Sequence, residues 1–135
     1  MKFAENLKVR DVMTRSVITV AMDVSVRDVI KTLAKEDITG VVVIEPKGGI
    51  MGIISEMDIV KAFNEDLDKL TAEDIMADKV KTIKPESTIK DAADVMKKEK
   101  VHRLVIVHEK GSLGIPSHPI GILSASDIVH LIAKK

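Results

Sequence analysis

The chain repeats itself over nearly the whole of its 135 residues. A shift of 63 positions aligns VRDVM at residues 9–13 with AEDIM at 72–76, and a shift of 69 aligns GIISEMDIV at 52–60 with GILSASDIV at 121–129. The difference between the shifts is an insertion around LGIPSHP at 113–119. A repeat of this length predicts two copies of one supersecondary unit and not two unrelated domains.

Each copy begins with an extended piece and a helix. The extended pieces are expected at residues 17–20 and 80–83. Capping boxes, Ser25 with Asp28 and Thr88 with Asp91, then mark the two helix starts, because the serine or threonine and the acid three residues later satisfy free backbone amides. The apolar residues of the expected helices recur at the spacing of a buried face. They are Val26, Val29, Ile30 and Leu33 in the first copy and Ile89, Ala92, Ala93 and Met96 in the second.

Two β-branched runs and a second helix complete each copy. The runs lie at residues 41–44 and 50–54, joined by a Gly48-Gly49 turn, and at 104–107 and 120–123. Proline cannot donate to a sheet ladder, so Pro119 is expected outside the strands. The second helices are predicted to turn apolar residues inward. These are Ile59, Val60 and Phe63 in the first copy and Ile128, Leu131 and Ile132 in the second.

The predicted unit is therefore β-α-β-β-α, and the fold class is α/β (α+β). A unit of roughly 60 residues has a marginal core by itself, so we expect the two repeats to pack sheet against sheet as a pseudo-twofold pair. The first repeat is predicted at residues 8–63, a linker at 64–73 and the second repeat at 74–133.

Composition excludes several classes of function. The 21 acidic and 21 basic side chains cancel, and Phe3 and Phe63 are the only aromatic residues, which disfavours nucleic-acid binding. Zero cysteines exclude disulfides and thiolate sites, and no apolar run is long enough to span a bilayer. A soluble, cytoplasmic protein is expected. The four histidines have no metal-ligand spacing; they are His102, His108, His118 and His130.

A duplicated unit that opens with D-V-M or D-I-M and closes with G-h-h-S-x-x-D-I (h apolar) resembles the CBS domain, which is named after cystathionine beta-synthase and usually occurs as a tandem pair. The VHRLVIV segment at 101–107 strengthens the match, and the resemblance covers residues 8 to 133. It implies a regulatory module that binds AMP, ADP, ATP or S-adenosylmethionine in clefts between the repeats.

The resemblance also implies a role for each site residue. The aspartates, Asp58 and Asp127, hold the ribose hydroxyls, for which two carboxylate oxygens are well suited. Ser55 and Ser124 lie near the phosphate at helix starts, where anions are favoured. The basic pair before the third strand, His102 and Arg103, reaches the phosphates, and the extended pieces form the adenine slot with Thr19, Val20, Thr82 and Ile83.

Simpler interpretations stay open for several of these residues. Each S-x-x-D motif is also a plain capping box, like the one at Ser25, where no ligand is suspected. His102 and Arg103 also fit a solvated strand start. For Met13 and Met76 two interpretations are open, that they line the adenine slot or that they fill the core.

Three functions compete: an adenosyl-ligand sensor, a ligand-free docking scaffold and an enzyme. The sequence has no nucleophile beside a base, no phosphate-cradling glycine loop and no metal cluster, so no enzyme is expected. A homodimer is expected, because the second helices carry more apolar residues than one inward stripe needs.

The two ligand sites should be unequal. Arg103 has no basic counterpart in the first copy, where Thr39 and Gly40 stand before the strand. The resemblance groups His102, Arg103, Ser124 and Asp127 with residues 17–20, and Ser55 and Asp58 with 80–83.

Overall fold

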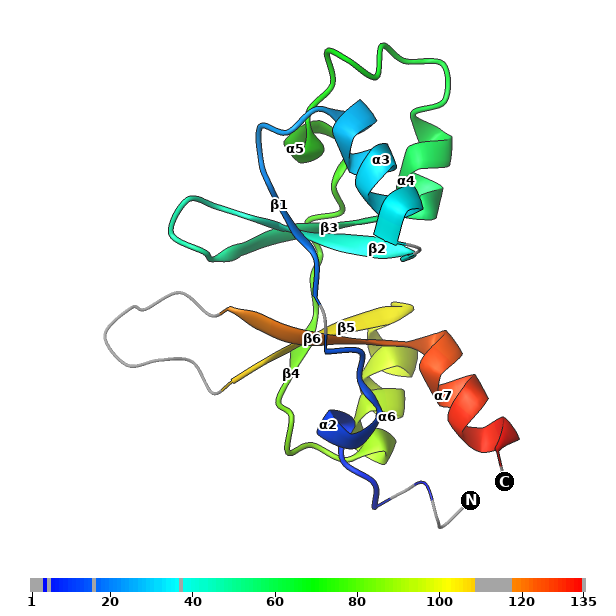
Figure 1. The fold of residues 1–135 in the computed structure, drawn as a ribbon. Coiled ribbons are helices and arrows are strands. Elements are labelled where there is room, and N and C mark those ends of the chain that lie inside the picture. The colour runs from blue at the N-terminus through cyan, green and yellow to red at the C-terminus, as the bar shows by residue number, and fades with distance from the viewer. Residues whose placement is uncertain (1–3, 5, 16, 37, 109–117, 135) are drawn as a thin grey trace. The chain divides into compact units, whose positions relative to one another are not determined.

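The computed structural model describes residues 4, 6–15, 17–36, 38–108 and 118–134. The chain divides into two compact units, residues 18–80 (the central unit) and residues 1–17 with 81–135 (the terminal unit). Each unit contains one three-stranded sheet with its own helices (Figure 1). The mixed α/β class predicted from the sequence is therefore confirmed.

The central unit has the predicted β-α-β-β-α order followed by one further helix. Its elements are β1 (Thr19–Ala21), α3 (Val26–Glu36), β2 (Gly40–Ile44), β3 (Ile50–Ser55), α4 (Glu56–Lys61) and α5 (Ala72–Ile75). Strands β1 and β2 are parallel and are connected through α3, whereas β2 and β3 form an antiparallel hairpin. Gly48, in the hairpin turn, has φ 92°, a backbone conformation that side-chain-bearing residues rarely adopt.

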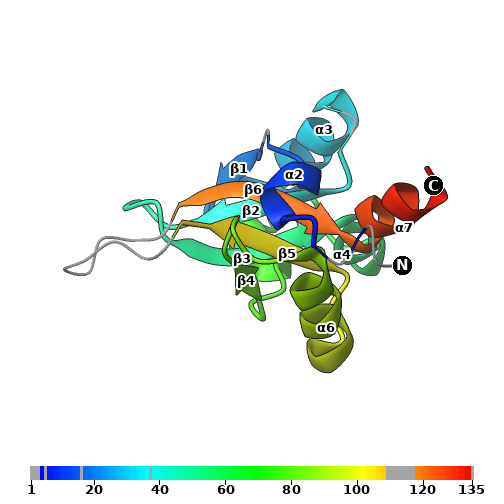
Figure 2. The ribbon, with the colours of Figure 1, turned by 90° about the horizontal axis from the view of Figure 1, so that it is seen from below.

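The terminal unit repeats this arrangement. Its elements are α2 (Val9–Val12), β4 (Thr82–Ile83), α6 (Ile89–Glu99), β5 (Arg103–Val107), β6 (Pro119–Ser124) and α7 (Ala125–Ala133). Strands β4 and β5 are parallel, β5 and β6 are antiparallel, and β6 runs directly into α7 (Figure 2). The predicted strand and helix positions are thus confirmed in both copies.

The first helix of each sequence repeat lies in the other compact unit. Helix α2 precedes the first repeat's strands, yet the Val9 amide donates to the Ser87 carbonyl at 2.8 Å and the Ile89 amide to the Leu7 carbonyl at 2.8 Å. In the central unit α5 is joined to the start of α3 in the same way, and one of these bonds runs from the Ala72 amide to the Val24 carbonyl at 2.8 Å. The compact units therefore differ from the repeats in sequence, whose boundaries stay a prediction.

The segment after each of these short helices lies along the edge strand of its unit. Thr14 and Ile122 exchange two backbone hydrogen bonds, of 2.9 and 3.0 Å, and Ala77 and Ile53 exchange a similar pair. A side chain at Gly121 would place its Cβ 2.4 Å from the Met13 sulfur. The glycine that opens the G-h-h-S-x-x-D motif therefore leaves room for the methionine of the D-x-M motif, which packs directly over it.

The core of each unit forms between its sheet and the longer helix, and the predicted buried faces of the two longer helices are confirmed. Val26, Val29 and Leu33 of α3 are buried, and so are Ile89, Ala92 and Met96 of α6. This agrees with the 3.6-residue spacing of these apolar positions, because that spacing places them on one helix face.

The inward orientation expected for the second helices is wrong at three positions. Val60 is 60% exposed and Phe63 79%, and Ile132 of α7 is also exposed. Ile59, Ile128 and Leu131 do pack against the cores. Each second helix therefore covers its core with one side and presents further apolar side chains to solvent.

Pro119 is the first residue of β6, not part of the loop as expected. It pairs with Val107 where the register shifts, a strand-end position that tolerates a residue without an amide proton. Most of the insertion around 113–119 lies outside the described residues.

Candidate ligand-binding site

Each closing motif places its serine and aspartate at the junction of a strand and a helix. Ser55 ends β3 and precedes α4, and its amide donates to Asp58 Oδ2 at 2.8 Å. Ser124 ends β6 and precedes α7, and its amide donates to Asp127 Oδ2 at 2.8 Å. Both motifs therefore form capping boxes, as their spacing predicted.

Burial separates these two boxes from the others in the described part of the chain. Asp58 and Asp127 are half-buried, whereas the cap carboxylates Asp11, Asp74 and Asp91 are exposed. A helix cap functions equally well in full contact with water, so partial burial of a carboxylate is not required for capping. The arrangement at Asp58 and Asp127 is therefore more enclosed than capping alone demands.

The serine hydroxyls of the two boxes make different hydrogen bonds. Ser124 Oγ accepts from the Asp127 amide at 3.1 Å, which leaves its proton available to another acceptor. Ser55 Oγ donates its proton to Asp58 Oδ2 at 3.2 Å. The Ser124 hydroxyl can therefore donate to a ligand, whereas the Ser55 hydroxyl already donates to Asp58.

The residue opposite each serine also differs between the units. In the antiparallel β5–β6 pair Arg103 is the register partner of Ser124, whereas Gly40 is the partner of Ser55 in the central unit. Leu104 and Leu123 point into the core, so Arg103 and Ser124, one position away along their strands, share the opposite sheet face. Arg103 is half-buried there.

His102 is exposed, and its backbone has a structural role. Its carbonyl accepts from the Ala125 amide at 2.9 Å, which joins the start of α7 to the start of β5. This hydrogen bond helps to hold Ser124 opposite Arg103.

The predicted slot residues alternate between the two faces of their sheets. Val20 packs in the core of the central unit and Ile83 packs against that of the terminal unit. Thr19 and Thr82 are exposed, and Thr82 is the register partner of Val105, on the sheet face that carries Arg103. The grouping of residues 17–20 with Asp127, and of 80–83 with Asp58, stays a prediction.

The D-x-M methionines pack against their own units. Met13 is 8% exposed and belongs to the terminal core, and Met76 packs against the central core. Sequence reasoning assigned no role to Gly52 and Gly121, although each is the first residue of a closing motif. Their coincidence in the two repeats was the signal that a close contact requires glycine there.

Shifted pKa values occur away from these residues. A hydrogen bond from Lys8, with the nearby charge of Arg10, lowers the pKa of Glu86 on the loop before α6. Within the described ranges no cluster of three histidine or acidic residues could hold a metal ion. No helix in that part of the chain is long and apolar enough to cross a membrane.

Solved structures of CBS domain pairs share this fold. The CBS domain pair of protein MJ0100, in complex with 5′-methylthioadenosine and S-adenosyl-L-methionine, is 28% identical, with a TM-score of 0.78 over 95% of this chain and 98% of that one. The CBS domain of a CBS domain-containing membrane protein from Sphaerobacter thermophilus is 27% identical, with a TM-score of 0.80 over 96% and 90%.

Curated relatives differ in length. An uncharacterized protein of Methanocaldococcus jannaschii is 30% identical over 95% of this chain and 92% of its own length. A homoserine O-acetyltransferase of Methanococcoides burtonii is 34% identical over 96% of this chain, which spans only 25% of that enzyme. The CBS domain family model matches residues 9–65 and again 72–134. The chain therefore belongs to the CBS domain family and carries two copies of the domain.

Proposed function

We propose that this protein is a regulatory module that binds an adenosyl compound through its two Ser–Asp boxes and catalyses no reaction. The observation that carries the proposal is the partial burial of Asp58 and Asp127, in contrast to the exposed carboxylates of the other capping boxes. A solved CBS pair that is 28% identical and holds two adenosyl compounds supports the same chemistry.

The box carboxylates retain hydrogen-bond acceptor positions that could take the hydroxyls of a ribose. Asp127 Oδ2 accepts the Ser124 amide, and a carboxylate has about four acceptor positions over its two oxygens. It therefore retains capacity for the two hydroxyls of a vicinal diol, in charge-assisted hydrogen bonds. Asp58 Oδ2 accepts from both the amide and the hydroxyl of Ser55, so Asp58 retains about two acceptor positions.

The ligand class is adenosyl, and two groups of compounds are candidates within it. AMP, ADP and ATP suit the Arg103 side of the terminal unit, because guanidinium groups bind phosphate oxygens well. S-adenosylmethionine and 5′-methylthioadenosine carry no phosphate and suit the central unit, where Gly40 stands opposite Ser55. We propose that His102, Thr19, Val20, Thr82 and Ile83 complete the contacts.

Isothermal titration calorimetry with AMP, ADP, ATP, S-adenosylmethionine and 5′-methylthioadenosine tests this function. At least one compound should bind, and Asp58→Ala or Asp127→Ala should weaken its binding roughly tenfold or more, as the loss of a charge-assisted pair predicts. Asp91→Ala is the matched control, because the exposed Asp91 closes a capping box of the same type at the start of α6. It should lower stability to a similar extent and leave affinity unchanged.

Absence of heat and of any thermal shift with all five compounds at millimolar concentration would contradict ligand binding. Steady hydrolysis of ATP that Asp127→Ala abolishes would contradict the non-catalytic part of the proposal. Equal losses of affinity in Asp127→Ala and Asp91→Ala would show that the aspartates act only as helix caps.

We also propose that the protein forms a homodimer and transmits ligand binding to a protein partner. Exposed apolar side chains on α4 and α7 support self-association, because exposed apolar surface often marks an interface. A hexameric CBS-CP12 protein from bloom-forming cyanobacteria is 26% identical over 91% of this chain. Light scattering should give about twice the chain mass of 14.8 kDa.

The absence of cysteine fits a reducing compartment, so the cytoplasm is the proposed location.

A further inference from the structure

The outer edge of the strand that carries each Ser–Asp box is paired with a segment from elsewhere in the chain. Strand β6 ends the order β4-β5-β6, and on its outer edge Thr14 and Ile122 exchange backbone hydrogen bonds of 2.9 and 3.0 Å. On the outer edge of β3, Ala77 and Ile53 exchange a matching pair of 2.9 and 3.0 Å. We call residues 9–14 of the terminal unit and residues 72–77 of the central unit the bracing segments.

The box carboxylate is bonded to the same edge of the strand. Amide groups alternate between the two edges along a strand, so the amides of Ile122 and Ser124 point the same way. The Ile122 amide donates to Thr14, and the Ser124 amide donates to Asp127 Oδ2 at 2.8 Å. At about 3.4 Å per residue these two hydrogen bonds lie about 7 Å apart. The bracing segment and the carboxylate are therefore consecutive partners of one strand edge. The corresponding residues of the central unit are Ile53, Ser55, Ala77 and Asp58.

Side-chain packing joins the bracing segment of the terminal unit to the same strand. Val9 is fully buried and Met13 is 8% exposed, and both belong to the core cluster that contains Leu123 of β6. Ile128 of α7, the residue after the box aspartate, packs against this cluster too. Displacement of the bracing segment would therefore uncover part of the core against which the strand and the helix of the box pack.

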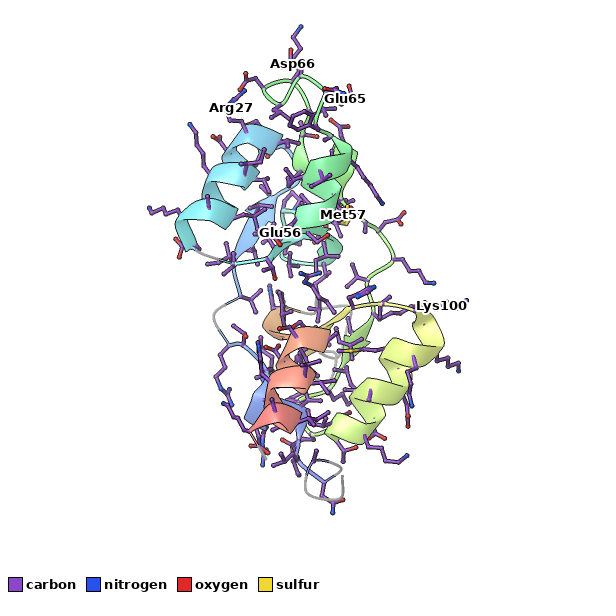
Figure 3. All side chains as sticks on the ribbon, turned by 90° about the vertical axis from the view of Figure 1, so that its right-hand side faces the viewer. Arg27, Glu56, Met57, Glu65, Asp66 and Lys100 are labelled. Atoms are coloured by element: carbon purple, nitrogen blue, oxygen red, sulfur yellow. The ribbon has the colours of Figure 1, made fainter. Side chains whose placement is uncertain are left out.

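Each box also fixes where the following helix begins. Ser55 is the N-cap of α4, and Glu56 and Met57 open the helix directly after it (Figure 3). In such a box the carboxylate and the amide of the cap residue hold each other, so a shift of the strand end moves the carboxylate and the helix start together. The orientation of the carboxylate oxygens that remain for a ligand therefore depends on the position of the strand edge.

We propose that each bracing segment regulates the ligand site of its unit. Docking of residues 9–14 on β6 raises ligand affinity at Asp127, and docking of residues 72–77 on β3 raises it at Asp58. The inference rests on the proposed function and makes Thr14 and Ala77 positioning residues. A strand end whose edge has lost its partner must be ordered when the ligand binds, and the apparent affinity falls in proportion to the fraction of molecules in which the segment is docked.

This regulation acts in both directions, because a coupling free energy between two events is reciprocal. A ligand at Asp127 should tighten the Thr14 bridge by the same factor by which the bridge raises ligand affinity. Thr14 stands five residues before Thr19, the start of β1 in the central unit, and Ala77 stands five residues before Thr82, the start of β4 in the terminal unit. Ligand binding in either unit therefore acts on the segment through which the chain enters the other unit.

Proline at the two bridge positions removes the amide donor at little further cost. Thr14 and Ala77 are exposed, so their substitution changes no buried side chain. Met13 has φ −60° and ψ 154°, and Met76 has φ −64° and ψ 148°, the extended conformation that a residue before proline prefers. Thr14→Pro and Ala77→Pro are therefore a matched pair, one for each unit. Thr14→Ala and Ala77→Thr, which keep the amide, are the controls.

Calorimetry of these variants in single-site backgrounds tests the proposal. Asp58→Ala leaves the terminal box, which is titrated with AMP, and Asp127→Ala leaves the central box, which is titrated with 5′-methylthioadenosine. Thr14→Pro should weaken AMP binding about threefold or more, as the loss of one hydrogen bond predicts, and leave the affinity for 5′-methylthioadenosine unchanged. Ala77→Pro should do the reverse. The two controls should change neither affinity.

Amide hydrogen exchange provides a second measurement that needs no proline. In the Asp58→Ala variant, AMP should slow the exchange of the Thr14 and Ile122 amides about threefold or more and leave the Ile53 and Ala77 amides unchanged. A bridge with a purely structural role would not respond to ligand in this way.

Each alternative result has a distinct meaning. Unchanged AMP affinity in Thr14→Pro, or equal losses of both ligands in both proline variants, would overturn the regulation and leave ligand binding intact. If the proline variants do not fold, unaltered exchange of the Thr14 and Ile122 amides with AMP bound would overturn it independently. Absence of heat with AMP in the Asp58→Ala variant and with 5′-methylthioadenosine in the Asp127→Ala variant would overturn both the regulation and ligand binding by these compounds.

Discussion

Arg103 lies directly opposite Ser124 in the antiparallel β5–β6 pair, whereas Gly40 occupies the corresponding position opposite Ser55 in β2–β3. The two Ser–Asp boxes therefore have the same backbone geometry and different neighbours. A fixed cation beside a hydroxyl with a free proton favours an anionic ligand group, whereas at Ser55 the opposite residue is uncharged and the hydroxyl already donates to Asp58.

This difference predicts that Arg103→Ala weakens AMP binding at one of two sites. The loss of a charge-assisted contact costs about 1.5–3 kcal/mol, which corresponds to roughly tenfold or more in affinity. Adenosine affinity should barely change, because adenosine has no phosphate to lose. Calorimetric titrations of both ligands measure the effect. Equal AMP affinity in the wild type and Arg103→Ala, with Asp127→Ala still damaging, would show that Arg103 does not contact the phosphate.

Substitution of the closing-motif glycines by alanine should destabilise the fold to different extents in the two units. A Cβ at Gly52 would lie 2.8 Å from the Ala77 carbonyl oxygen, and one at Gly121 would lie 3.1 Å from that of Thr14. A backbone carbonyl held in a strand bridge moves less easily than a methionine side chain. Gly52→Ala should therefore lower the free energy of unfolding by about 1–3 kcal/mol, and Gly121→Ala by less. Urea denaturation of both variants measures the difference. A larger loss in Gly121→Ala would contradict this account of the contact.

Lys100 predicts a stabilising substitution. It follows α6 with φ 56° and ψ 46°, the left-handed conformation that glycine adopts without steric cost. Lys100→Gly should raise the free energy of unfolding by about 0.5–1 kcal/mol, since the relief of strain exceeds the added entropy of the unfolded chain. Lys98→Gly, inside the same helix, is the control and should lower it by about 1 kcal/mol. Thermal unfolding measures both, and destabilisation by Lys100→Gly would be the contrary result.

Glu86 predicts a pH-dependent contribution to the docking of α2. Its carboxylate accepts from Lys8 at 3.0 Å and also pairs with Arg10, which lowers its pKa below the ordinary 4.5. A carboxyl group whose pKa is lower in the folded than in the unfolded state stabilises the fold at pH values above its unfolded-state pKa. This stabilisation is lost as the pH falls through the folded-state pKa. The stability difference between wild type and Glu86→Gln should thus be present at pH 7 and disappear well below pH 4.5. A difference that stays constant over this range would contradict the ion pair's role.

The sequence predicted the strands of both units and helices α3, α4, α6 and α7, but not the short helices α2 and α5, because the signals of the predicted elements are local. The spacing of Val26, Val29 and Leu33 and the boxes at Thr88 and Ser124 depend only on residues within one helix turn or two. Duplication strengthened each assignment, since every element was expected twice.

The sequence did not predict where α2 and α5 pack, because that depends on contacts distant in the chain. The fit of Met13 over Gly121 joins positions more than a hundred residues apart, and no periodicity encodes it. The exposure of Val60 and Phe63 was missed for a related reason. An apolar stripe shows that a face avoids water, and it does not show which surface will cover it.

Above all, we propose that the half-buried aspartates Asp58 and Asp127 bind an adenosyl ligand. Equilibrium dialysis with a radiolabelled adenosyl compound identified by calorimetry tests it most directly, on the wild type, on Asp58→Ala combined with Asp127→Ala, and on Asp28→Ala combined with Asp91→Ala. The last variant removes two exposed carboxylates from the first turns of α3 and α6. We predict saturable binding in the wild type and in the Asp28/Asp91 variant and none in the Asp58/Asp127 variant. Undiminished binding in the Asp58/Asp127 variant, with the fold retained, would contradict the claim.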